Sequence, residues 1–190
     1  ENDVLWSSFG PAGVEGWFDT KVWDKTHDEK AAQGWTAFVL DYNGNGKRDA
    51  YTEPNQPNDP AKDKRLQIQY YGDSPAFDGS IWGTVQGMPG ALVRVVPGAH
   101  PPETTLSEIY EVPWNNPKAT TQGFAPRGMD VDSNNVVWTV LSSGHLASFD
   151  RRKCAAPLNG PTATGQHCPE GWALYPLPGP NYKGAVDPAS

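Results

Sequence analysis

The chain has 190 residues, enough for one domain with a sizeable core, and its 20 Gly and 19 Pro exclude long helices. Its 37% hydrophobic share includes eight Trp, seven Tyr and six Phe, which excludes low-hydrophobicity disorder. The net charge is −7 and the Lys and Arg residues form no stripe, so nucleic acid is not an expected partner. The sequence contains no apolar run of about 18 residues, so no membrane span is predicted.

The first predicted element is a hairpin over residues 2–20. Its first strand contains Trp6, a small-residue turn follows, and its second strand ends near Asp19. Another short strand is predicted in the sequence QGWTAFVLD, residues 33–41. Strands separated by Gly, Pro, Asn and Asp turns indicate an all-β fold.

Residues 41–53, DYNGNGKRDAYTE, follow that strand and have the spacing of a calcium-binding loop. Such a loop carries oxygen ligands at positions 1, 3, 5 and 9, a backbone carbonyl at 7, Gly at 6 and Glu at 12. Here Thr52 stands at position 12 and a Glu comes one residue later. The predicted ligands are the side chains of Asp41, Asn43, Asn45, Asp49 and Glu53 and the backbone carbonyl of Lys47.

The predicted ion would be structural. No helical pattern flanks the loop, so we expect an isolated calcium loop rather than an EF-hand. The ion would rigidify the polar, Pro-rich insertion 42–66. The alternative is a metal-free turn, because Asn-Gly pairs after a strand are also typical of ordinary hairpins.

Two further hairpins repeat the design of the first. They span residues 78–98 and 133–152, and each has a Trp in its first strand, Trp82 and Trp138. Short strands are predicted on both sides of each hairpin, in 74–80 and 107–114 for one and in 125–133 and 171–179 for the other. Four antiparallel strands in a repeat of about 40 to 50 residues are typical of a propeller blade.

The two cysteines, Cys154 and Cys168, enclose a loop rich in turn-forming residues. Their spacing fits neither a redox pair nor a zinc quartet, so the sequence favours a disulfide and hence an oxidising compartment. Two free thiols in a cytosolic protein are the alternative.

The stretch APRGMDVDSNNVVWTVLSSGHLASFD, residues 125–150, resembles the blade repeat of the virginiamycin B lyase (streptogramin lyase) propeller family. The resemblance extends to 74–96 and, faintly, to 2–20. It implies a β-propeller, in which 1–73 would be an incomplete blade with the calcium-loop insertion and 74–124 a second blade. Residues 125–190 would be a third blade with the disulfide loop and the start of a following strand in NYKGAVDPAS.

Propellers close with about four to eight blades, so two to three blades predict a segment of a larger propeller. The remainder of that propeller or another protein subunit is therefore the expected partner, along with a possible small-molecule ligand.

The family resemblance also implies metal-assisted elimination by His and Glu residues around the propeller axis. His145 is the candidate here, because it alone of the four His lies in a turn that would face a ligand. The acidic residue that ends the corresponding strand in the family is absent from WTVL, 138–141. Three charged residues before that strand would line the channel and bind a polar ligand or, alternatively, hold neighbouring blades together: Arg127, Asp130 and Asp132.

These observations predict a secreted or periplasmic scaffold that binds a ligand or partner through loops braced by calcium. The alternative is a metal-dependent lyase or lactonase whose active site is completed by blades outside this chain. A purely structural subunit is a third possibility.

Overall fold

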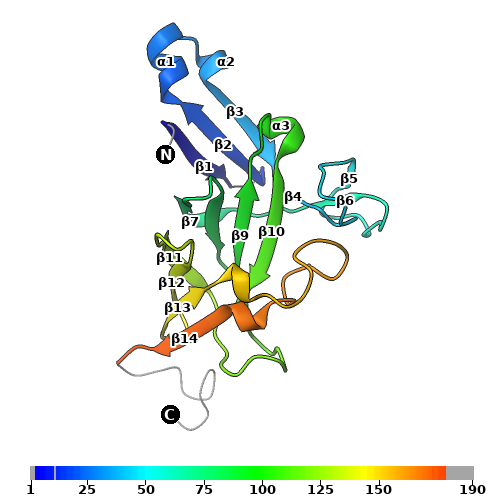
Figure 1. Cartoon of the computed structure of the whole chain (residues 1–190), viewed down its shortest axis with the longest axis vertical. Helices are drawn as coiled ribbons and strands as arrows, with labels where there is room; N and C mark the ends of the chain where they lie inside the picture. Colours follow the sequence, from blue (N-terminus) through cyan, green and yellow to red (C-terminus); the bar gives the residue numbers. More distant parts are fainter. Residues whose placement is uncertain (1–2, 11, 179–190) are drawn as a thin grey trace.

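Three β-sheets, stacked along the long axis of the molecule, make up most of the chain (Figure 1). The computed structural model describes residues 3–10 and 12–178. The described helices are short: α1 (Thr20–Thr26), α2 (Glu29–Ala32) and α3 (Pro101–Thr104), with 3₁₀ turns at Arg151–Lys153 and Pro169–Gly171. The predicted all-β class is thus confirmed, with antiparallel sheets as the main structure.

The N-terminal sheet is an antiparallel meander of three strands. They are β1 (Val4–Phe9), β2 (Val14–Asp19) and β3 (Gln33–Ala37), in that order across the sheet. Helices α1 and α2 connect β2 to β3, and both begin at an Asp that caps the helix. Asp19 accepts a hydrogen bond from Val22 N at 2.9 Å, and Asp28 accepts one from Lys30 N at 2.9 Å, because the first N–H groups of a helix lack intrahelical partners.

The central sheet has seven strands in the order β5-β6-β4-β10-β9-β8-β7. Their bounds are β4 (Val39–Leu40), β5 (Tyr51–Thr52), β6 (Asp63–Arg65), β7 (Tyr70–Pro75), β8 (Ile81–Val85), β9 (Ala91–Val96) and β10 (Leu106–Glu111). Strands β7 to β10 form an antiparallel meander. The polar, Pro-rich insertion 42–66 supplies β5 and β6, which extend this sheet through β4.

The C-terminal sheet is a four-stranded antiparallel meander. It consists of β11 (Pro126–Val131), β12 (Val137–Leu141), β13 (His145–Phe149) and β14 (Trp172–Pro176). The loop between β13 and β14 is closed by the Cys154–Cys168 disulfide, so that prediction is confirmed. The strand start predicted in NYKGAVDPAS lies outside the described residues.

The three hairpins share one strand register. In each hairpin, the residue just before the Trp pairs with an apolar residue near the end of the next strand. The pairs are Leu5 with Phe18, Ile81 with Val95, and Val137 with Phe149. The third residue after each Trp likewise pairs with the first residue of the next strand: Phe9 with Val14, Val85 with Ala91, and Leu141 with His145. Since side chains alternate between the two faces of a strand, residues at matching positions point the same way in all three sheets.

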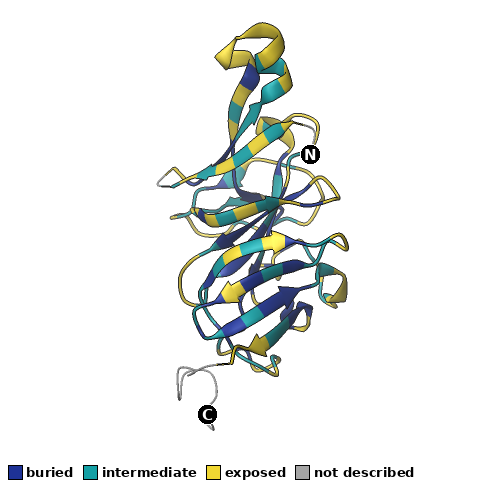
Figure 2. Ribbon diagram, turned by 90° about the vertical axis from the view of Figure 1, so that its left-hand side faces the viewer, coloured by how far each residue is buried: buried dark blue, intermediate teal, exposed yellow. Residues whose placement is uncertain are grey.

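Two apolar clusters hold the sheets together, and Figure 2 shows buried residues concentrated along the stack. The larger cluster lies between the central and C-terminal sheets and includes Trp82, Tyr110 and Phe149. The smaller one includes Tyr70 and Val93 of the central sheet, with Trp6 of the N-terminal sheet packed against it. Trp6 and Trp82 therefore both face the sheet that follows their own.

Candidate metal centre

The predicted calcium loop leaves the end of β4 through a tight turn around Asp41. The Asp41 side chain is buried, and its two oxygens accept hydrogen bonds from the backbone N–H groups of Asn45, at 3.0 Å, and Gly46, at 2.8 Å. Gly44 and Gly46 have φ values of 77° and 76°, a left-handed conformation that glycine adopts without strain. The turn therefore folds around the carboxylate of its first residue.

The next predicted ligands gather around Asp49. Asp49 Oδ2 accepts hydrogen bonds from the side-chain amides of Asn43, at 3.1 Å, and Asn45, at 2.6 Å. These bonds hold the pKa of Asp49 below its usual value, with Asn45 contributing most. The amide oxygens of Asn43 and Asn45 accept the N–H groups of Asn45 and Lys47, respectively. Asp41, Asn43, Asn45, Lys47 and Asp49 thus form one hydrogen-bonded loop.

A residue that the sequence did not mark completes the cluster: Asp63, the first residue of β6. Its side chain is fully buried, and its Oδ2 accepts a hydrogen bond from Asp49 N at 2.7 Å. Its Oδ1 is buried without a hydrogen-bond partner among the described residues. Burial raises the pKa of Asp63, and the negative charges of Asp41 and Asp49 raise it further. A buried carboxylate oxygen that lacks a donor is costly unless a cation or proton compensates it.

Glu53, the doubtful last position of the predicted loop, is engaged elsewhere. Its carboxylate pairs with Arg65 Nη1 at 3.0 Å. Its backbone carbonyl accepts a hydrogen bond from Lys64 Nζ at 2.8 Å. Asp63 therefore lies beside Asp49 of the loop, whereas Glu53 is paired with an arginine.

The donor set determines which cations would fit. In the described part of the chain, no group of three or more His, Cys, Asp or Glu side chains is arranged to hold a metal ion as it stands. The loop instead combines the carboxylates of Asp41, Asp49 and Asp63 with the amides of Asn43 and Asn45. Oxygen donors of this kind suit hard cations such as calcium or magnesium and do not suit zinc or copper.

The loop is anchored to distant parts of the chain. Arg48 donates hydrogen bonds to Thr36 Oγ1 at 2.8 Å and to the Thr105 carbonyl at 3.2 Å, so it connects the loop to the strand β3 and to the start of β10. The backbone carbonyl of Asp41 accepts a hydrogen bond from Gly160 N, at 2.9 Å, in the disulfide loop. The conformation of the loop therefore depends on contacts with all three sheets or their connections.

His145, the candidate for catalysis, begins strand β13 and is buried, with 2% of its surface exposed. Its Nδ1 lies 3.1 Å from Ser143 Oγ, and burial lowers its pKa. His145 was expected in a turn that faces a ligand, but it lies in the strand and its side chain is buried. Among the residues that the structure describes, His145 belongs to no group of three or more His, Cys, Asp or Glu side chains that could hold the metal ion of a lyase or lactonase.

The three residues predicted to line a channel make contacts within and between sheets. Arg127 donates from Nε to Ser142 Oγ at 3.0 Å, and its guanidinium lies 5.6 Å from the centre of the Tyr71 ring. Asp130 Oδ1 accepts a hydrogen bond from Ser74 Oγ of β7 at 2.9 Å. Asp132 accepts the indole N–H of Trp138 and, with smaller effect, backbone N–H groups of its turn, and these bonds lower its pKa. Arg127 and Asp130 thus contact β7 of the central sheet, whereas the contacts of Asp132 stay within its own sheet.

A buried acid between the N-terminal and central sheets was also missed. Glu15 of β2 is fully buried, and neither of its carboxylate oxygens has a hydrogen-bond partner within the described ranges. Burial, and then the charge of Asp73, raise the pKa of Glu15 to about 8. Nothing in the sequence around Glu15 distinguishes it from an acid on the exposed face of a strand.

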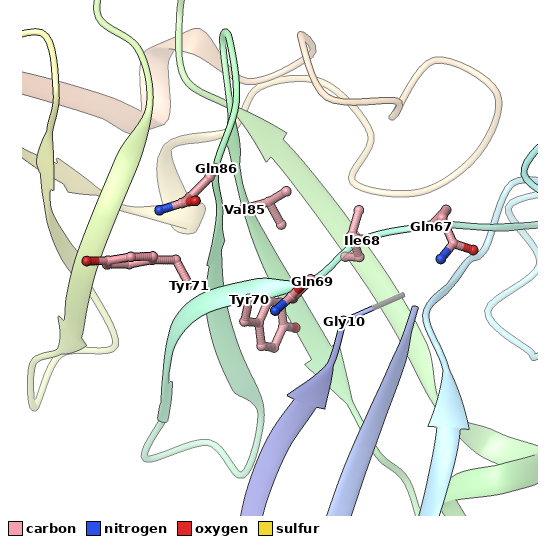
Figure 3. Close-up of a pocket in the computed structure, with 8 residues that line it drawn as sticks. All are labelled: Gly10, Gln67, Ile68, Gln69, Tyr70, Tyr71, Val85 and Gln86. Carbon is pink, nitrogen blue, oxygen red and sulfur yellow. The ribbon is translucent and has the colours of Figure 1, made fainter. Parts of the chain in front are cut away.

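An open pocket lies beside this interface, at the end of β1 and the start of β7 (Figure 3). Three glutamines and two tyrosines dominate its lining: Gln67, Gln69, Gln86, Tyr70 and Tyr71. The lining contains no carboxylate, imidazole or amine. Its amides and aromatic rings are suited to hydrogen bonding and stacking with a neutral polar ligand.

No protein-family model, curated protein or solved structure matches the chain. The resemblance to the streptogramin lyase family therefore remains a prediction from the sequence. No helix in the described ranges is long and apolar enough to cross a membrane. Fold and site together define a class, namely a mostly β protein with stacked antiparallel sheets, one disulfide and a loop rich in oxygen donors.

Proposed function

We propose that the chain is a calcium-braced segment of a β-propeller, secreted or periplasmic, that binds a ligand or a partner protein through loops on rigid sheets. The meanders β7–β10 and β11–β14 have the strand number and order of propeller blades. The disulfide is compatible with an oxidising compartment. The unpartnered Oδ1 of Asp63 is the observation that carries the calcium part of the proposal.

A calcium ion would resolve the charge problem of this loop. The negative charges of Asp41 and Asp49 act on Asp63, and Asp41 and Asp63 are buried. With calcium, the oxygens of these residues and of Asn43 and Asn45 would turn from hydrogen bonding among themselves to the ion. Asp63 would take the ligand position predicted for Glu53, and the Lys47 carbonyl remains a candidate ligand. The ion would fix the insertion against the central sheet, where β5 and β6 already pair.

Calcium titration of the full chain after chelation of bound metal tests this proposal. We expect calorimetry to show binding of about one ion, and thermal unfolding to move to a higher temperature with calcium, because a ligand of the native state stabilises it by mass action. Magnesium is the comparison ion. Absence of binding at millimolar calcium would contradict the proposal.

Asp63→Asn tests the assigned ligand, with Asp59→Asn as the matched control in the same insertion. Asp59 is partly exposed and caps the turn before β6 through a bond from Ala61 N, which an amide oxygen also accepts. We expect Asp63→Asn to weaken calcium binding at least about tenfold and to abolish the calcium-dependent thermal shift. We expect Asp59→Asn to bind calcium as the unmodified chain does. Equal affinities for both variants would rule out Asp63 as a ligand.

A further inference from the structure

The outer face of the N-terminal sheet exposes large apolar side chains. Leu5, Phe9 and Trp35 are 64%, 61% and 66% exposed, and Phe18 lies on the same face. Strand pairing gives the matching positions on the other two sheets, which are Ile81, Val85, Val95 and Ile109 on the central sheet and Val137, Leu141, Phe149 and Leu174 on the C-terminal sheet. All eight belong to or pack against the two apolar clusters between sheets. The exposed face therefore has the pattern of a face that receives another sheet.

The outer face of the C-terminal sheet exposes an aromatic pair of the kind that is covered on the central sheet. On the central sheet, Trp82 stacks on Tyr110 with ring centroids 5.8 Å apart, and both are buried under the C-terminal sheet. On the C-terminal sheet, Trp138 stacks on Tyr175, at the matching positions, with centroids 6.1 Å apart. Here Tyr175 is 46% exposed and the neighbouring Val140 is 42% exposed. This outer face carries the aromatic pair that, one sheet earlier, is covered by a neighbour.

The residue that covers the buried pair has a counterpart on the N-terminal sheet. Phe149 packs against both members of the buried pair, 5.9 Å from Trp82 and 4.6 Å from Tyr110. By strand register, the counterpart of Phe149 on the N-terminal sheet is Phe18. One end of the molecule thus presents an exposed Trp–Tyr pair. The other end presents the counterparts of the residues that cover such a pair, with Phe18 itself packed against Trp23 of α1 at a centroid distance of 5.9 Å.

We propose that two copies of this chain associate head to tail, with the outer face of the C-terminal sheet of each copy packed on the outer face of the N-terminal sheet of the other. A second copy is the occupant because each chain carries, on its two open faces, both halves of the contact seen between the central and C-terminal sheets. Two copies bring six sheets together, which falls in the range of about four to eight blades in which propellers close. The proposal concerns the sheet faces and is independent of calcium binding.

The molar mass of the 190-residue chain in solution tests the association. We expect sedimentation equilibrium at micromolar concentrations to give twice the chain mass of 20.6 kDa. Trp35→Asp on one face and Tyr175→Asp on the other should each raise the dissociation constant at least about 30-fold, the effect of losing a central aromatic contact. Phe77→Asp is the matched control, since Phe77 is 58% exposed in the turn before β8 and lies on neither face.

Mixing the two face variants distinguishes a head-to-tail contact from a symmetric one. In a dimer of either variant alone, every contact includes one substituted face. In the mixture, the unchanged Tyr175 face of the Trp35→Asp chain can pack on the unchanged Trp35 face of the Tyr175→Asp chain. We expect a one-to-one complex only in the mixture. A monomeric unmodified chain, or a dimer that neither variant weakens, would overturn the proposal. Circular dichroism of each variant confirms that it is folded, and its calcium titration should be unchanged.

Discussion

The two interfaces between sheets are built on the same hairpin register but contain different chemistry. Between the central and C-terminal sheets, Trp82, Leu92 and Tyr110 meet an apolar face. Between the N-terminal and central sheets, the positions that match Leu92 and Tyr110 are Glu15 and Thr36. The comparison shows that the repeat preserves backbone pairing while each interface has its own balance of apolar and ionisable groups. We therefore expect the first interface to contribute most of the stability and the second to respond to pH.

The largest expected effect comes from removing the aromatic centre of the apolar interface. Trp82→Ala should lower the free energy of unfolding by about 4 kcal/mol, because a fully buried large side chain leaves a cavity that its neighbours cannot fill. Trp6→Ala, at the matching position of the other interface, should cost about half as much, since Trp6 is only partly buried. Urea unfolding of both variants measures the difference. Equal losses would mean that the two interfaces contribute alike.

Removing the disulfide should have the next largest effect and should extend beyond the C-terminal sheet. The double variant Cys154→Ser, Cys168→Ser should lose about 3 kcal/mol, as expected for a cross-link that closes a loop of this size. Gly160 lies within that loop and donates its N–H to the Asp41 carbonyl, so calcium affinity should also fall by a few-fold. Urea unfolding and calcium titration test the two effects separately. Unchanged calcium affinity would show that the metal loop holds its shape without this contact.

The features that the sequence predicted correctly are local, and those it missed depend on distant pairing. The Trp-containing hairpins and the disulfide could be predicted because spacing and turn residues determine them within about 20 residues. Asp63 could not be assigned, because only the parallel pairing of β5 with β6 brings it beside Asp49. Glu15 could not be recognised as buried, because β7, the strand that packs near it, starts more than 50 residues later at Tyr70. The local sequence pattern determines where strands form, whereas tertiary packing determines which strand faces are buried.

The smallest expected effect comes from Glu15, the buried acid in the interface between the N-terminal and central sheets. Because the pKa of Glu15 rises from 4.5 unfolded to about 8 folded, the native state keeps a proton that the unfolded chain releases between these values. Stability should therefore fall as pH rises from about 4.5 to 8, because the unfolded chain releases this proton first. Glu15→Leu installs the side chain found at the matching positions, Leu92 and Leu146, and should raise stability near pH 8 by about 1 to 2 kcal/mol while flattening the profile. Glu29→Gln, an exposed acid in α2, is the control that should leave the profile in place. A pH profile of thermal unfolding that is the same with and without Glu15 would show that its carboxyl group ionises in the folded state as it does in the unfolded chain.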